Sequence, residues 1–143
     1  DGVEHVRRLK NKGAERRREG DFDGAEKYFE WALGINPKCT TCLKDWAEIL
    51  LTKKQYSAAE TKIRRVLELL ENQDSDALFT LGIILSEQGR DDESIEAYTQ
   101  SVALNADDAE LCYNLGIKLG AKGQVEEELK MYRRATQVDP HFG

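Results

Sequence analysis

The feature that most constrains the fold is a pattern of small and apolar residues that recurs along the whole chain. Similar segments begin at Ala25, Ala59, Ser94 and Glu128, so the spacings between them are 34, 35 and 34 residues. Matching upstream segments begin at Leu9, Leu43, Leu78 and Cys112. Within both kinds of segment, small or apolar residues lie three and four positions apart, which is the period of one helical face. The sequence therefore predicts a two-helix unit repeated four times.

The residues between paired segments suit the ends of helices. Three of the four turns carry glycine where a left-handed residue is preferred, and Lys54 occupies that place in the second unit at an expected cost. The glycines are Gly20, Gly89 and Gly123. The predicted N-caps are Asp21 or Asp23, Ser57, and Asp91 or Asp92 for the second helices, with Thr40 or Thr41, Asp74 or Ser75, and Asp107 or Asp108 for the first helices. Small residues that would let the paired helices approach closely are Gly13, Ala47, Gly82 and Gly116.

These residues resemble the tetratricopeptide repeat, with Leu-Gly in the first helix and a small residue, an aromatic residue and a second small residue in the second. The repeats lie near 6–39, 40–74, 75–108 and 109–142, and make residues 1–143 one domain. The resemblance implies an all-α fold, an α-α superhelix (solenoid) of antiparallel helix pairs, and a protein–protein interaction scaffold with no catalytic activity. Pentatricopeptide repeats have a similar length and bind RNA, but the repeat residues and the acidic balance favour the tetratricopeptide family.

The two ends of the chain depart from the pattern. Lys12 and Arg16 replace large apolar residues in the first repeat, as is expected where a terminal repeat meets solvent. At the other end, Tyr132, Ala135 or Val138 is expected to be partly uncovered. The chain begins without methionine, and its last residues stop where a further helix would start. We expect a piece of a longer protein, in which the open C-terminal end is an alternative surface for self-association or spacing.

Charge is unevenly distributed along the chain. The first 20 residues carry +3 and the remainder −9, within a total of −6. An acidic body argues against a nucleic-acid partner, because phosphate binding needs a positive surface. No apolar run is long enough to cross a bilayer, so direct membrane insertion is not expected. The basic end would attract an acidic partner segment, or it is simply a solvated helix face.

The resemblance implies which side chains line a concave groove on the first helices. Those we expect to bind a partner peptide are the cations Lys10, Arg17, Arg18 and Lys44, for an acidic flank, and the apolar anchors Phe79, Ile83, Tyr113 and Ile117. Alternatively the anchors pack against one another. We do not expect chaperone C-terminal tails as partners, because Asp76 or Glu110 falls where the family's carboxylate clamp needs a cation.

Residues for chemistry are few. The two histidines, His5 and His141, lie at opposite ends of the chain, so we expect no enzyme activity, no metal and no cofactor. Cys39 and Cys42 form a CxxC pair without the second ligand pair that zinc requires. The preferred interpretation is a joint between repeats, and the alternative is a reversible, redox-sensitive disulfide. Three cysteines without a disulfide framework favour a reducing compartment such as the cytoplasm, although the sequence names no compartment.

Overall fold

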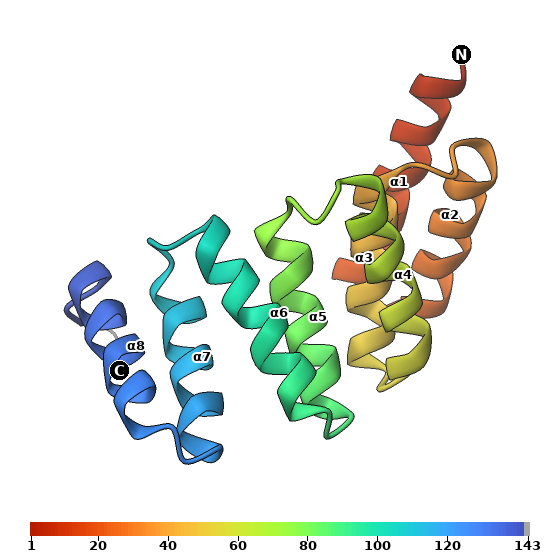
Figure 1. Ribbon diagram of the computed structural model, residues 1–143. Coiled ribbons are helices and arrows are strands. Elements are labelled where there is room, and N and C mark those ends of the chain that lie inside the picture. Colours follow the sequence, from red (N-terminus) through yellow and green to blue (C-terminus); the bar gives the residue numbers. More distant parts are fainter. Residues whose placement is uncertain (142–143) are drawn as a thin grey trace. The chain divides into compact units, whose positions relative to one another are not determined.

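The computed structural model describes residues 1–141, whose regular structure is helical (Figure 1). In order, the helices are α1 (Gly2–Arg18), α2 (Phe22–Ile35), α3 (Thr40–Thr52), α4 (Tyr56–Leu69), α5 (Ser75–Glu87), α6 (Asp91–Leu104), α7 (Ala109–Ala121) and α8 (Val125–Val138). Among the described residues, no helix is both long enough and apolar enough to cross a membrane. The contacts divide the chain into an N-terminal half, Asp1–Glu71, and a C-terminal half, Asn72–Gly143.

Each half contains two helix pairs. In the N-terminal half α1 pairs with α2 and α3 with α4, and in the C-terminal half α5 pairs with α6 and α7 with α8. The second helix of one pair also packs on the first helix of the next, as α2 does on α3 and α6 on α7. The predicted repeats of two helices are therefore confirmed.

All four pairs turn by the same backbone motif. After α1, the N–H of Gly20 donates to the carbonyl of Arg17 (3.0 Å) and the N–H of Asp21 to that of Arg16 (2.8 Å). The same two bonds recur after α3, α5 and α7, so each first helix ends in a Schellman motif. The left-handed residue is glycine in three turns and Lys54, with φ of 61°, in the other, as the sequence predicts.

The Schellman motif also fixes where each second helix begins. The residue after the left-handed one is the N-cap, and it is Asp21, Gln55, Arg90 or Gln124. Only Asp21 caps with its side chain, which accepts the N–H of Gly24 (2.9 Å). The predictions of Ser57 and of Asp91 or Asp92 as caps are therefore wrong, because these residues already lie inside the first helical turn. Asp74 and Asp108 do cap α5 and α7 as predicted.

Close approach within a pair depends on small residues beneath aromatic rings. A Cβ atom on Gly13 would lie 2.7 Å from Cε1 of Phe29, and a Cβ on Gly116 equally close to Cε1 of Tyr132. Gly82 lies in the same way under the ring of Tyr98. The ring of the second helix thus occupies the space that a side chain on the first helix would need, which confirms the predicted role of these glycines.

Candidate functional site

The predicted cations of the N-terminal half gather around a carboxylate. Burial raises the pKa of Asp45 on α3, and the charge of Glu48 raises it further. The nearby cations Arg17 and Lys10 of α1 and Lys44 of α3 lower the same pKa, but by less than burial raises it. Across the gap between α1 and α3, Nη1 of Arg17 lies 2.8 Å from Oε2 of Glu48. The surface is therefore a mixed network of charges rather than a purely basic patch.

A hollow of about 280 Å³ lies within this network, lined by Ala14, Arg17, Arg18, Phe29 and Asp45. Arg18 is exposed at its edge, whereas Lys10 and Lys44 are half-buried. Asp45 was not among the residues predicted to face the groove. The sequence could have indicated this position, because Asp45 lies three residues before Glu48 and residues three apart share one face of a helix.

The four predicted apolar anchors of the C-terminal half fall into two classes. Phe79 and Ile83 of α5 are half-buried against the core of this half, and the ring of Phe79 lies 5.8 Å from that of Tyr98 at 43°. Tyr113 and Ile117 of α7 keep 36% and 43% of their surfaces exposed. The latter two lie one helical turn apart, and Tyr113 also packs on Tyr132 at 5.5 Å between ring centroids. Of the four predicted anchors, the two exposed ones therefore both lie on α7.

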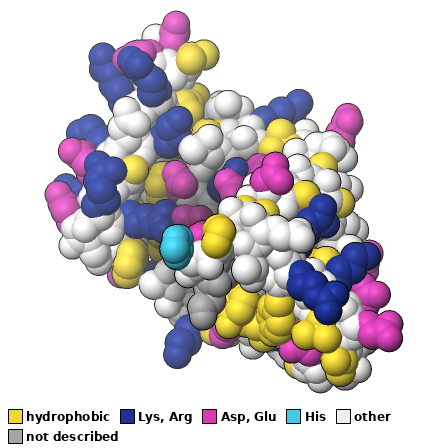
Figure 2. All heavy atoms as spheres, turned by 90° about the vertical axis from the view of Figure 1, so that its left-hand side faces the viewer, with side chains coloured by type: hydrophobic (Ala, Val, Ile, Leu, Met, Phe, Trp, Pro, Cys, Tyr) yellow, Lys and Arg dark blue, Asp and Glu magenta, His cyan; other side chains and the backbone are white. Residues whose placement is uncertain are grey.

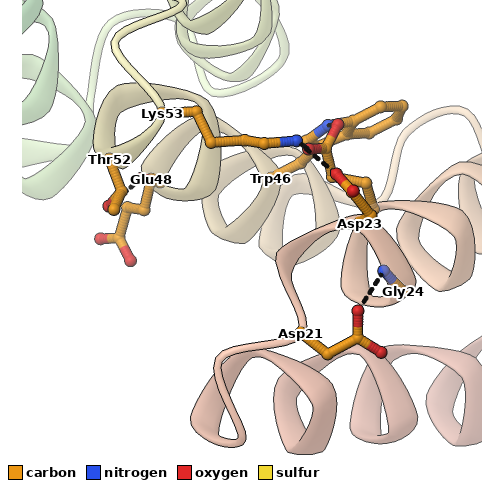
Figure 3. A network of polar contacts seen from close by, with 8 residues as sticks. Asp21, Asp23, Gly24, Trp46, Glu48, Thr52 and Lys53 are labelled. Carbon is orange, nitrogen blue, oxygen red and sulfur yellow. Dashed lines mark hydrogen bonds and ion pairs between the residues drawn. The ribbon is translucent and has the colours of Figure 1, made fainter.

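A polar network that the sequence reasoning missed joins α2 to α3 (Figure 3). Nζ of Lys53 lies 2.6 Å from Oδ1 of Asp23 and 2.6 Å from Oε1 of Glu26, and Nε1 of Trp46 donates to Oε2 of Glu26 at 2.9 Å. Nζ of Lys62 lies 4.1 Å from the centre of the Trp46 ring. The hydrogen bond from Lys53, followed by its charge, holds the pKa of Asp23 below its ordinary value. An acidic residue early in one helix thus binds a lysine at the end of the next.

The C-terminal half contains the counterpart of this joint between repeats. Nζ of Lys122 lies 2.8 Å from Oδ1 of Asp92, and Nζ of Lys118 lies 3.1 Å from Oδ1 of Asp91. Lys122 follows Lys53 by 69 residues, and Asp92 follows Asp23 by the same number, which is the length of two repeats. The same ion pair therefore connects α2 to α3 and α6 to α7.

The cysteine pair lies at the start of α3. Cys39, rather than Thr40 or Thr41, is the N-cap, and its Sγ accepts the N–H of Cys42 at 3.4 Å. Cys42 is fully buried and packs with the core that α2 contributes, as expected for a joint between repeats. Burial, with a smaller contribution from the hydrogen bond to Cys39, raises the pKa of Cys42 to about 12. Within residues 1–141, no group of three or more His, Cys, Asp or Glu residues is placed to hold a metal ion.

Comparison with protein families identifies the repeat. Models described as tetratricopeptide repeat match residues 11–77 and 109–142, and a model described as TPR repeat matches residues 82–123. The chain belongs to the tetratricopeptide repeat family. No curated protein matches this tetratricopeptide repeat chain in sequence.

Solved structures of the MamA protein share the tetratricopeptide fold. "Crystal structure of MamA protein" has a TM-score of 0.89 at 21% identity and covers 98% of this chain and 76% of its own. "MamA 41-end from Desulfovibrio magneticus RS-1" has a TM-score of 0.85 at 20% identity, with coverage of 94% and 76%. "Crystal structure of MamA" has a TM-score of 0.84 at 22% identity, with coverage of 91% and 75%. At these identities the similarity shows the fold, an all-α superhelix of antiparallel pairs, as the sequence predicts.

Proposed function

We propose that the protein is a non-catalytic adaptor whose first helices bind a peptide segment of a partner protein. The observation that carries this proposal is the exposed pair Tyr113 and Ile117, one turn apart on α7. Two apolar side chains at this spacing are suited to anchor a partner, because buried aromatic and aliphatic contacts supply most of the binding energy of such interfaces. Tetratricopeptide repeats generally mediate protein–protein interactions, which supports the same class of function.

Phe79 and Ile83 have a different role in this proposal. Their half-buried side chains form the base on which a peptide rests, and truncating them would also weaken the core. Tyr113 and Ile117 are therefore the residues to change when binding is tested, because their removal leaves the buried core residues in place.

The N-terminal half contributes charge. Arg18 is exposed and steers an acidic flank of the partner at a distance, whereas Arg17 binds Glu48 and has to exchange that carboxylate for one of the partner. Lys10 and Lys44 lie close enough to Asp45 to influence its titration, so they contribute less net attraction than their number suggests. Binding should accordingly weaken as salt is added, but only modestly.

Selection from a phage-displayed random peptide library tests the proposal. Enriched peptides should carry two apolar residues and an acidic flank, and Tyr113→Ala or Ile117→Ala should each weaken them about tenfold. Leu104→Ala is the matched control, since Leu104 of α6 is 42% exposed in the same half and lies outside the proposed surface. If Tyr113→Ala and the double change Arg17→Glu/Arg18→Glu both leave affinity unchanged, the proposed function is wrong.

A second candidate is a reversible disulfide between Cys39 and Cys42, favoured by the close contact of Cys39 Sγ with the backbone of Cys42. The two thiols would reduce one molecule of oxidised glutathione, giving the protein disulfide and two molecules of reduced glutathione. The raised pKa of Cys42 opposes this reaction, because exchange proceeds through the thiolate. Intact mass after treatment of a Cys112→Ser variant distinguishes the outcomes: loss of two hydrogens supports a disulfide, and a glutathione adduct alone contradicts it.

A further inference from the structure

The hollow of the N-terminal half presents hydrogen-bond donors and an acceptor together. It is lined by Ala14, Arg17, Arg18, Phe29 and Asp45. Guanidinium groups only donate hydrogen bonds, and an ionised carboxylate only accepts them. Figure 2 shows acidic side chains lying among basic ones over the face that it views, so mixed charge is a wider feature of this surface. A ligand that fits the hollow therefore needs both an acceptor and a donor.

Asp45 is the acceptor, and its carboxylate has no donor of its own. Its side chain is half-buried, and burial raises its pKa. Arg17, Lys10 and Lys44 act on it through their charge, and no hydrogen bond from the described residues contributes. The charged carboxylate has thus lost part of its hydration without gaining a hydrogen bond in return, which is unfavourable. A ligand that donates a hydrogen bond here would remove part of this cost.

The two arginines of the hollow are not equally available to a ligand. Arg17 of α1 is bound to Glu48 of α3, with 2.8 Å between Nη1 and Oε2. Arg18 is exposed at the edge of the hollow. A guanidinium carries several N–H donors, so Arg18 can donate to a group inside the hollow without breaking an existing ion pair to Glu48. Arg18 is therefore the donor that a ligand meets first.

The classes of side chain do not suit this arrangement equally. A carboxylate would accept from Arg18 but be repelled by Asp45, and an ammonium group would bind Asp45 but meet the charge of Arg17. An apolar side chain would leave the carboxylate of Asp45 without a donor. A primary carboxamide is uncharged and carries an NH2 donor and a carbonyl acceptor on separate atoms. It satisfies Asp45 and Arg18 at once without adding charge.

We infer that this hollow binds the side-chain carboxamide of a glutamine or asparagine of the partner's peptide, with Asp45 accepting a hydrogen bond from its NH2 group and Arg18 donating one to its oxygen. The inference rests on the proposed function and adds the class of residue that the N-terminal half recognises. The acidic flank of the peptide then lies outside the hollow, because Asp45 repels a carboxylate that enters it. Asp45 is accordingly the residue that determines specificity at this point of the surface.

Capped single amino acids are suitable probes, because they share one backbone and differ only in the side chain. N-acetyl-glutamine N-methylamide is added to the full, isotope-labelled chain at neutral pH, and NMR follows the backbone amide signals of Arg18 and Asp45. The matched probes are the same derivatives of glutamate, lysine and methionine. Glutamine should bind about threefold to tenfold more tightly than each of them. Equal or tighter binding of glutamate, or no shift caused by glutamine up to its solubility, would overturn the inference.

Asp45→Asn tests the residue on which the selection depends. An asparagine here no longer repels a carboxylate and can donate to one, so glutamate should now bind about threefold to tenfold more tightly than glutamine. Asp107→Asn is the matched control, because it removes the same charge from an exposed residue of the C-terminal half and should keep the preference for glutamine. A reversal in both variants would show that net charge is the cause, and a reversal in neither would show that Asp45 does not select; each result overturns the inference.

The peptide selection separates this inference from the proposed function. Enriched peptides should carry glutamine or asparagine near their acidic flank. Enriched peptides that lose affinity with Tyr113→Ala but contain neither residue would overturn the inference while the proposed function stands. If capped glutamine binds selectively and no peptide is enriched, the hollow has the inferred ligand class and the proposed function fails. Tyr113→Ala should leave the titration with capped glutamine unchanged, because Tyr113 belongs to the C-terminal half.

Discussion

Replacing Gly82 by alanine is the most direct test of how the helix pairs are held together. The new Cβ would meet the ring of Tyr98, which is 5% exposed and therefore has no solvent to move into. The two helices cannot easily separate either, because Oγ of Ser94 on α6 donates to the carbonyl of Gly82 on α5 at 2.8 Å. Gly82→Ala must therefore either displace a buried ring or break this bond.

Two effects of opposite sign set the magnitude. Overpacking a closed core costs about 1–3 kcal/mol. Alanine in place of glycine within a helix returns roughly 0.5–1 kcal/mol. We expect a net loss of about 1–2 kcal/mol in the free energy of unfolding. Gly116→Ala should cost less, because the ring that covers it belongs to the half-buried Tyr132 on α8, which has room to turn.

Urea unfolding followed by far-UV circular dichroism measures the effect, and the midpoint of Gly82→Ala should fall by roughly 0.5–1 M. The control is Gly34→Ala in α2, where an added Cβ would meet nothing within 4 Å. It should stabilise the chain by about 0.5–1 kcal/mol, because only the helical preference of alanine changes. The explanation fails if Gly82→Ala is as stable as the unchanged protein, or if Gly34→Ala destabilises to the same extent.

Three further predictions concern single residues. Lys54→Gly should increase the free energy of unfolding by about 0.5–1 kcal/mol, because it removes the cost of a left-handed backbone at a non-glycine residue. The urea midpoint should rise accordingly, and an unchanged midpoint would contradict this. Burial raises the pKa of Asp45, so the charged form of this side chain destabilises the folded chain at neutral pH. Asp45→Asn should therefore raise Tm at pH 7, and the gain should disappear below about pH 4, where the carboxyl group is protonated in both states. A gain that persists in acid would refute this cause. An alkylating reagent at neutral pH should modify Cys39, as read out by mass spectrometry, whereas Cys42 and Cys112 should react only on unfolding, because burial raises the pKa of both buried thiols. Rapid labelling of Cys42 or Cys112 would show that the thiol is accessible in the native state.

Repetition made the fold predictable from sequence. A single Leu-Gly segment is weak information, but a left-handed residue at 20, 54, 89 and 123 marks the same turn four times, and three of these residues are glycine. The starts of the second helices were less predictable, since preference for acidic and hydroxyl N-caps favoured Ser57 and Asp91. The Schellman motif determines those starts through backbone hydrogen bonds, which place Gln55 and Arg90 at the cap regardless of their side chains.

The candidate binding surface stays a prediction, and the sequence anticipates only part of the state of its residues. The family resemblance implies that Tyr113 and Ile117 face the groove, and both side chains are exposed. The resemblance does not reveal that Phe79 packs on Tyr98, or that Arg17 is bound by Glu48 from another helix. Those features depend on which side chains meet between helices, and only the three-dimensional packing determines this.

The ion pairs between α2 and α3 and between α6 and α7 have a consequence for how the molecule responds to salt. Lys53 and Lys122 each bind a carboxylate of the preceding helix pair, Asp23 or Asp92. Both contacts lie at the surface, so added salt screens them to a similar extent. Raising the salt concentration should therefore loosen the joint between repeats in each half and leave the turns within each pair intact, because those turns are held by backbone hydrogen bonds.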